Sequence, residues 1–322
     1  MLDFLFADWL DKPVWLWLSF IGIVSVLLAL DLGVLHRKDR EIGVVESLVT
    51  SAVYIALGLA FGGWIWWYMG ATAGMNYVTG FVIEKSLAMD NVFVIAMIFT
   101  YFGVPRLYQH RVLFWGILGV IVLRAIMIGL GASLVEQFSW VLYVFAAFLI
   151  VTGIKMWLFA DKEYDVAANP VLKFVRRHFR VTDRLYGQRF WVRLPDAATG
   201  NPTWYMTPLM LALLIVEIVD LVFAVDSVPA IFAITTDPFI VYTSNIFAIL
   251  GLRALYFLLA GIIHKFHFLK LGLSAVLVFV GAKMLLVDLY KVPVGASLGV
   301  IAAILGASVV ASLVWPKANA AH

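Results

Sequence analysis

Two short acidic motifs carry most of the chemistry that this sequence could perform. The first spans residues 84–92 and reads EKSLAMDNV, and the second spans residues 220–228 and reads DLVFAVDSV. Each motif places an acidic residue six positions before an aspartate, which is followed by an uncharged polar residue and a valine. Hard divalent cations prefer carboxylate, amide and hydroxyl oxygens as ligands. The repeated motif therefore predicts a cation site built from oxygen ligands.

Candidate ligands come from these motifs and from one acid nearby. Glu217 stands three residues before Asp220, so a helix would place both carboxylates on one face. The sequence has no cysteine, and none of its six histidines lies near the acids, which disfavours Zn²⁺ and Cu(I) and favours Mn²⁺, Mg²⁺ or Ca²⁺. The predicted metal ligands are Glu84, Asp90, Asn91, Glu217, Asp220, Asp226 and Ser227.

The chain around these motifs is too apolar for a water-soluble protein. Hydrophobic residues make up 64% and charged residues 13% of its 322 residues, whereas soluble proteins have ~45–50% and ~25%. No enzymatic activity is expected, because Ser86 and Ser227 have no histidine in their segments to act as a base. The net charge of +3 does not indicate nucleic-acid binding, since basic residues in a membrane protein report its topology.

Nine apolar segments of about 20 residues are each long enough to cross a ~30 Å hydrocarbon core. We therefore predict an all-α polytopic membrane protein with about nine transmembrane helices. Sixteen of the 23 Lys and Arg residues then fall on one side of the membrane. The positive-inside rule places the N-terminus outside and the C-terminus in the cytoplasm. The segments lie near residues 14–36, 48–69, 76–102, 112–134, 139–159, 206–234, 240–263, 267–290 and 295–315.

Three landmarks recur in the same order in both halves of the chain. The acidic motifs come first, Arg124 and Arg253 follow within Leu-Arg-Ala, and Gly153 and Gly281 open the pattern Gly-x-Lys-Met. Each copy holds three predicted spans, so the second copy must enter the membrane from the opposite side. This is an inverted three-helix repeat, in which substrate sites lie near the membrane midplane.

The repeats divide the chain into five parts. An N-terminal end with two helices covers residues 1–75, and the first repeat covers 76–159. A basic cytoplasmic loop follows at 160–205, and the second repeat covers 206–290. The last part, 291–322, holds a final helix and a cytoplasmic tail.

Five of the predicted ligands are carboxylates inside membrane segments, and their insertion costs on the order of 12–18 kcal/mol before compensation. Buried ion pairs to nearby basic residues would be the simplest compensation. The five acids outnumber three basic residues of the membrane segments, Lys85, Arg124 and Arg253. A bound cation or protons would balance the remaining negative charge. The supporting charged and polar residues are Lys85, Arg124, Arg253, Asn245 and, near the inner interface, Asp31.

Two further features predict local structure. Pro229 would clash with the carbonyl of Val225, so we expect a break there that turns Asp226 toward the site. In the basic loop, apolar residues of 171–179 recur at helical spacing, which predicts an amphipathic helix on the anionic inner leaflet. Residues 189–194 and 203–206 bracket a turn-rich stretch and predict a hairpin.

The motifs resemble those of the TerC family of bacterial membrane proteins. The matching stretches are residues 84–93, 123–128, 217–233 and 243–257. This resemblance implies an inner-membrane protein of the LysE-like superfamily that exports Mn²⁺, with links to alkaline pH. It also implies that the acids of both motifs contact the metal, which is the transported ion; no permanently bound cofactor is expected.

Three functions remain open from the sequence. In the first, Mn²⁺ or another divalent cation leaves in exchange for protons, since two entering protons cancel the ~4.6 kcal/mol that two outward charges cost at 100 mV. In the second, the protein exports an amino acid, with Arg124 or Arg253 receiving its carboxylate. In the third, it is a non-transporting scaffold for pH or metal stress, and the arginines of 173–193 recruit a cytoplasmic partner.

Overall fold

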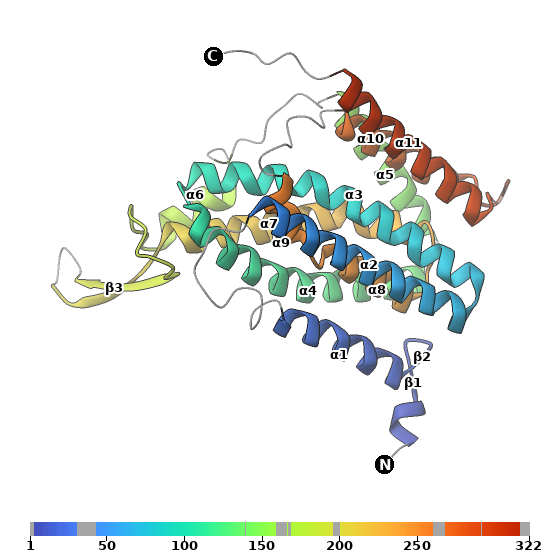
Figure 1. The fold of residues 1–322 in the computed structure, drawn as a ribbon, viewed down its shortest axis with the longest axis horizontal. Coiled ribbons are helices and arrows are strands. Elements are labelled where there is room, and N and C mark those ends of the chain that lie inside the picture. Colours follow the sequence, from blue (N-terminus) through green and yellow to red (C-terminus); the bar gives the residue numbers. More distant parts are fainter. Residues whose placement is uncertain are drawn as a thin grey trace.

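A computed structural model describes residues 3–30, 43–138, 140–158, 166, 169–195, 200–259, 268–290 and 292–315. The described chain is mostly helical (Figure 1). Its helices are η1 (Asp3–Phe6), α1 (Val14–Leu30), α2 (Val44–Met69), α3 (Ala71–Tyr101), α4 (Arg106–Gln137), α5 (Val141–Leu158), α6 (Pro170–His178), α7 (Pro208–Phe232), α8 (Pro238–Ile249), α9 (Leu252–Leu259), α10 (Leu269–Leu285) and α11 (Val294–Val314). Strand β1 (Asp8–Trp9) pairs with β2 (Lys12–Pro13), and β3 (Trp191–Pro195) pairs with β4 (Pro202–Met206), both antiparallel.

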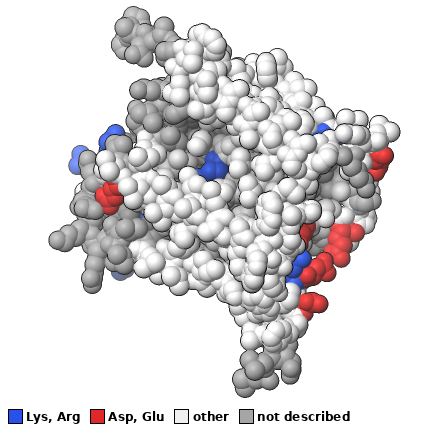
Figure 2. Space-filling model, turned by 45° about the vertical axis from the view of Figure 1, so that its right-hand side comes forward, with Lys and Arg blue, Asp and Glu red and all other residues white. Residues whose placement is uncertain are grey.

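Six helical segments among the described residues are long and apolar enough to cross a membrane: α2, α4, α5, α7, the segment Pro238–Leu258 that contains α8, and α11. Helix α1 is apolar but has only 17 residues. Much of the face in Figure 2 is uncharged, and acidic residues gather along one edge of it. These are the properties of a polytopic helical membrane protein. Each of the nine predicted segments overlaps at least one helix.

Helix α3 carries the first acidic motif through the middle of the bundle. It packs against α2, α7, α8 and α9 and also contacts α11. Buried apolar residues of α3 belong to three of the hydrophobic clusters, so neighbouring helices cover it on several sides. This position buries Glu84, Lys85 and Asn91 of the motif among protein side chains.

Helices α5 and α10 form a tightly packed pair beside the central helices (Figure 1). Gly153 of α5 faces Ser274 and Val278 of α10, while Gly281 of α10 faces Ala146 and Ile150 of α5. The hydroxyl of Ser274 donates to the carbonyl oxygen of Gly153. The absence of a side chain at both glycines lets the two backbones approach closely.

The expected break at Pro229 is wrong. Helix α7 continues through Pro229 to Phe232. Val228, Ile231 and Phe232 are buried around the proline, and this packing keeps the segment helical although one backbone hydrogen bond is lost. The interruption lies in the next segment, where α8 ends at Ile249 and α9 begins at Leu252.

The basic loop contains both elements expected of it. Helix α6 covers Pro170–His178, and β3 and β4 form a hairpin that projects from the bundle (Figure 1). Leu172 and Val175 of α6 are buried in a cluster that includes residues of α7, whereas Phe174 is 56% exposed. Part of the apolar face of α6 therefore packs on the protein itself. Its contact with an anionic leaflet stays a prediction.

Candidate functional site

Arg124 of α4 is the centre of a buried polar network. Its Nη2 lies 2.7 Å from Oε1 of Glu84 on α3, and the two side chains are 2% and 1% exposed. Its Nη1 donates to Ser227 Oγ on α7 at 2.7 Å and to Asn245 Oδ1 on α8 at 2.9 Å. Asn245 Nδ2 in turn donates to Glu84 Oε2 at 3.1 Å. One guanidinium thus joins four helices.

Asn91 and Asp220 form a second buried contact between the two acidic motifs. Asn91 Nδ2 donates to Asp220 Oδ1 at 3.0 Å, and the residues are 3% and 5% exposed. The amide oxygen, Asn91 Oδ1, is buried and has no hydrogen-bond partner in the part of the chain that the structure describes. An unsatisfied buried oxygen is unusual in a native protein and indicates a place for water or an ion.

The two motifs exchange partners across the bundle. Asn91 stands seven residues after Glu84, and Ser227 stands seven residues after Asp220. Asn91 pairs with Asp220, while Glu84 and Ser227 meet on the same guanidinium. The later position of each helix therefore lies near the earlier position of the other, so α3 and α7 run antiparallel here.

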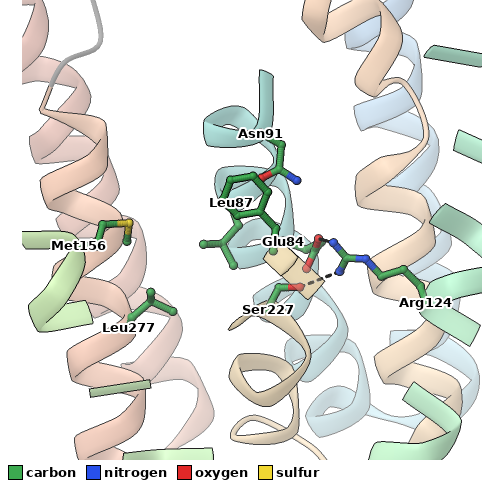
Figure 3. Close-up of a pocket in the computed structure, with 8 residues that line it drawn as sticks. Glu84, Leu87, Asn91, Arg124, Met156, Ser227 and Leu277 are labelled. Atoms are coloured by element: carbon green, nitrogen blue, oxygen red, sulfur yellow. Dashed lines mark hydrogen bonds and ion pairs between the residues drawn. The ribbon is translucent and has the colours of Figure 1, made fainter. Parts of the chain in front are cut away.

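A small cavity borders this network (Figure 3). Its polar lining consists of Glu84, Asn91, Arg124 and Ser227. The apolar lining consists of Leu87, Met156, Phe223 and Leu277, with Met156 and Leu277 contributed by α5 and α10. Its volume of about 30 Å³ holds roughly two water molecules. The cavity lies at the boundary between the α5–α10 pair and the helices that carry the motifs.

Glu217 lies one turn before Asp220 on α7 but does not line this cavity. Its carboxylate rests against the backbone of α4 at Gly119, where an added Cβ would overlap Oε1. Glu217 Oε2 is buried and has no hydrogen-bond partner among the described side chains. The glycine thus makes room for a carboxylate next to α4.

Among the residues that the structure describes, Lys85 contacts backbone carbonyl groups, and the ion pair with an acid that was weighed as the alternative to a cation site is not seen for it. Its Nζ donates to the carbonyl oxygens of Ala248 and Leu250, at 3.0 Å and 3.5 Å. The residue is 6% exposed. Its partners lie at the end of α8, where the helix is interrupted.

Some predicted residues are not placed in the site. The backbones of Asp90 and Asp226 lie in α3 and α7, but their side chains are outside the described part, as is the whole of Asp31. Arg253 of α9 is buried and does not line the cavity. Among the described side chains, no group of three or more acids or histidines is close enough to hold a metal ion. The metal-ligand assignment therefore stays a prediction.

Comparison with known proteins identifies the family. The model of the integral membrane protein TerC family matches residues 69–320. The chain belongs to the TerC family. The match begins just before α3 and includes both acidic motifs, Arg124, Asn245 and Lys85.

Relatives in the TerC family cover nearly the whole chain. An uncharacterized membrane protein of Myxococcus xanthus is 51% identical over 93% of this chain and 92% of its own. A protein of Escherichia coli K12 is 48% identical over 90% and 91%, respectively, and carries the name membrane-bound redox modulator Alx. A protein of the same name from Photorhabdus laumondii is 48% identical over 93% and 94%. No solved structure matches the chain.

The sequence did not predict several contacts of this TerC-family site. Asn245 belongs to one of the family stretches, but its bridging position between Glu84 and Arg124 depends on how α8 packs against α3. Met156 and Leu277 carry no chemical signal, and only the α5–α10 pair brings them to the cavity. The pattern Gly-x-Lys-Met, which ends at Met156 in α5, was the available signal for this side of the site.

Proposed function

We propose that this protein exports Mn²⁺ across the bacterial inner membrane in exchange for protons. The observation that carries the proposal is the cavity between the two acidic motifs, where Asn91 Oδ1 is buried without a hydrogen-bond partner among the described residues. Its volume suits an ion with little water around it. The oxygen ligands favour a hard cation, and the family resemblance selects Mn²⁺ among such ions.

Charge supports a cation as the cargo. Glu84 is compensated by Arg124 in the described network. In the part of the chain that the structure describes, Lys85 binds backbone carbonyls rather than an acid of the motifs. In our proposal Asp90, Asp220 and Asp226 supply the charge that the cation neutralises.

The antiparallel packing of α3 against α7, with contacts between the two motifs, supports the inverted repeat as the basis of transport. In such repeats a central site opens alternately to the two sides as one part of the protein rocks against the other. The cavity borders the α5–α10 pair, so movement of this pair would open or close it. In the proposed orientation the N-terminus is outside, the C-terminus is cytoplasmic, and Mn²⁺ enters from the cytoplasm.

Amino-acid export and redox modulation agree less well with the contacts and the composition of this chain. An exported amino acid needs a receptor for its carboxylate, but the guanidinium of Arg124 already binds Glu84, Ser227 and Asn245. Two relatives are named as redox modulators, yet this chain has no cysteine and hence no thiol for disulfide exchange.

The test measures the transport of each ion separately, in liposomes that contain the purified protein and an internal metal indicator. Mn²⁺, Mg²⁺, Ca²⁺ or lysine is supplied in turn, with and without a pH gradient. We expect Mn²⁺ flux that rises when protons can move in the opposite direction and that excess lysine does not reduce. Lysine flux without divalent flux would establish the amino-acid exporter instead, and absence of any divalent flux would overturn the proposal.

A further inference from the structure

Helices α8 and α9 are two halves of one interrupted membrane segment. The segment Pro238–Leu258 is 94% buried over its apolar window, and the interruption falls at Leu250 and Gly251. Gly251 has a φ of +80°, which favours glycine, and the chain changes conformation there. The last carbonyl groups of α8 consequently lack the partners that a continuous helix would supply.

The ammonium group of Lys85 lies at these carbonyls. Its Nζ is 3.0 Å from the oxygen of Ala248 and 3.5 Å from that of Leu250. Both contacts are buried, so water does not replace them. A positive charge is favourable at the C-terminal end of a helix, where the unpaired carbonyls concentrate negative potential.

The two halves of the chain provide an internal comparison. Lys85 follows the first acid of the first motif, and Leu221 occupies the matching position of the second motif. Helix α3, which carries Lys85, packs against the interrupted α8, whereas α7, which carries Leu221, packs against α4. Helix α4 runs without interruption from Arg106 to Gln137. The lysine therefore occupies the motif position that lies beside the interrupted helix α8, whereas the leucine occupies the position beside the continuous helix α4.

Carbonyl groups at the ends of interrupted helices bind Na⁺ or protons in many transporters. We propose that the ammonium of Lys85 occupies a monovalent-cation position at the end of α8, so that the chain supplies this cation itself. The α8–α9 interruption then holds its shape without Na⁺ or K⁺ from solution. This inference concerns the fold and does not depend on which substrate the protein moves.

Lys85→Ala in the full-length protein tests the inference, because it removes the ammonium and leaves space in its place. Thermal unfolding is followed in detergent with NaCl, KCl, ethylammonium chloride or choline chloride at equal ionic strength. Choline is too large for the vacated space and has no N–H donor. We expect the variant to melt on the order of 2–4 °C higher in Na⁺, K⁺ or ethylammonium than in choline. The wild type melts at the same temperature in all four salts.

Two controls separate a cation position from a general effect of salt or volume. Lys85→Met fills the space without a charge, and it is expected to be destabilised equally in all four salts. Lys155→Ala removes an exposed lysine of α5 and is expected to behave as the wild type. Equal melting of Lys85→Ala in choline and in the small cations would overturn the inference. Failure of Lys85→Ala to fold in every salt would also overturn it, because the small cations should refill the position.

Discussion

Gly153 of α5 and Gly281 of α10 hold matching places in one helix crossing, each against the backbone of the opposite helix. An added Cβ at Gly153 would lie 2.9 Å from the carbonyl oxygen of Ser274, and one at Gly281 would lie 2.7 Å from that of Ala146. Ser274 stands seven residues before Gly281, and Ala146 stands seven residues before Gly153. The contact is therefore reciprocal, as the proposed inverted repeat requires.

Alanine at either glycine of this crossing should destabilise the protein. Because backbone atoms cannot move aside easily, we expect Gly153→Ala and Gly281→Ala each to lower the free energy of unfolding by about 1–3 kcal/mol. Gly129→Ala in α4 is the matched control, because a Cβ there meets no atom within 4 Å. It should be neutral or stabilising by up to ~1 kcal/mol, since alanine favours helices. Equal melting temperatures for all three variants would contradict the reciprocal crossing.

The ion pair of Glu84 and Arg124 predicts strong coupling between the two residues. Arg124→Met alone leaves a buried carboxylate without its cation, and we expect a loss of about 3–5 kcal/mol in unfolding free energy. Glu84→Gln alone leaves a buried guanidinium and should also destabilise. The double variant should lose much less than the sum of the two. A double-mutant cycle of unfolding measures the coupling, and simple additivity would show that the pair is not formed.

The helix interruption at Gly251 should tolerate no side chain. Its φ is +80°, and an added Cβ would lie 2.7 Å from Cβ of Tyr54 in α2. Gly103 also has a positive φ, +59°, but a Cβ added there would meet no atom within 4 Å. Gly103→Ala should therefore cost only the conformational penalty of about 1–2 kcal/mol, and Gly251→Ala should cost more. Thermal unfolding compares them, and an equal loss would contradict the close contact with Tyr54.

Substitutions in the basic surface of α6 distinguish a transporter from a scaffold protein. Arg176 and Arg177 are exposed and lie far along the chain from both motifs. We expect Arg176→Gln with Arg177→Gln to leave the initial rate of Mn²⁺ transport in liposomes unchanged. A scaffold would instead lose its cellular effect in this variant while keeping it after loss of the motif acids. That pattern in cells, measured as growth in excess Mn²⁺, would count against transport.

Sequence reasoning predicted the helical segments and the paired motifs because apolar length and recurring residues are local signals. It placed the interruption at Pro229, where proline is the usual indication, but buried neighbours keep α7 helical. Gly251 gave no comparable signal, since glycine is common inside membrane helices. An ion pair of Lys85 with an acid was weighed as an alternative, and the carbonyl partners of Lys85 follow only from the end of α8 lying beside α3. The position of the interruption and the partners of Lys85 both depend on how distant segments pack together, and local sequence does not give this packing.

The most direct test of Mn²⁺ export through the two motifs is the initial rate of Mn²⁺ transport in liposomes that contain the Asp90→Asn or the Asp226→Asn variant. Each substitution keeps the side-chain size and removes one charge, and Glu136→Gln at an exposed position of α4 serves as the control. We expect both aspartate variants to lose most of their transport at equal reconstituted amounts, with the control at the wild-type rate. Wild-type rates in both aspartate variants would contradict the assignment of the two motifs as the cation site.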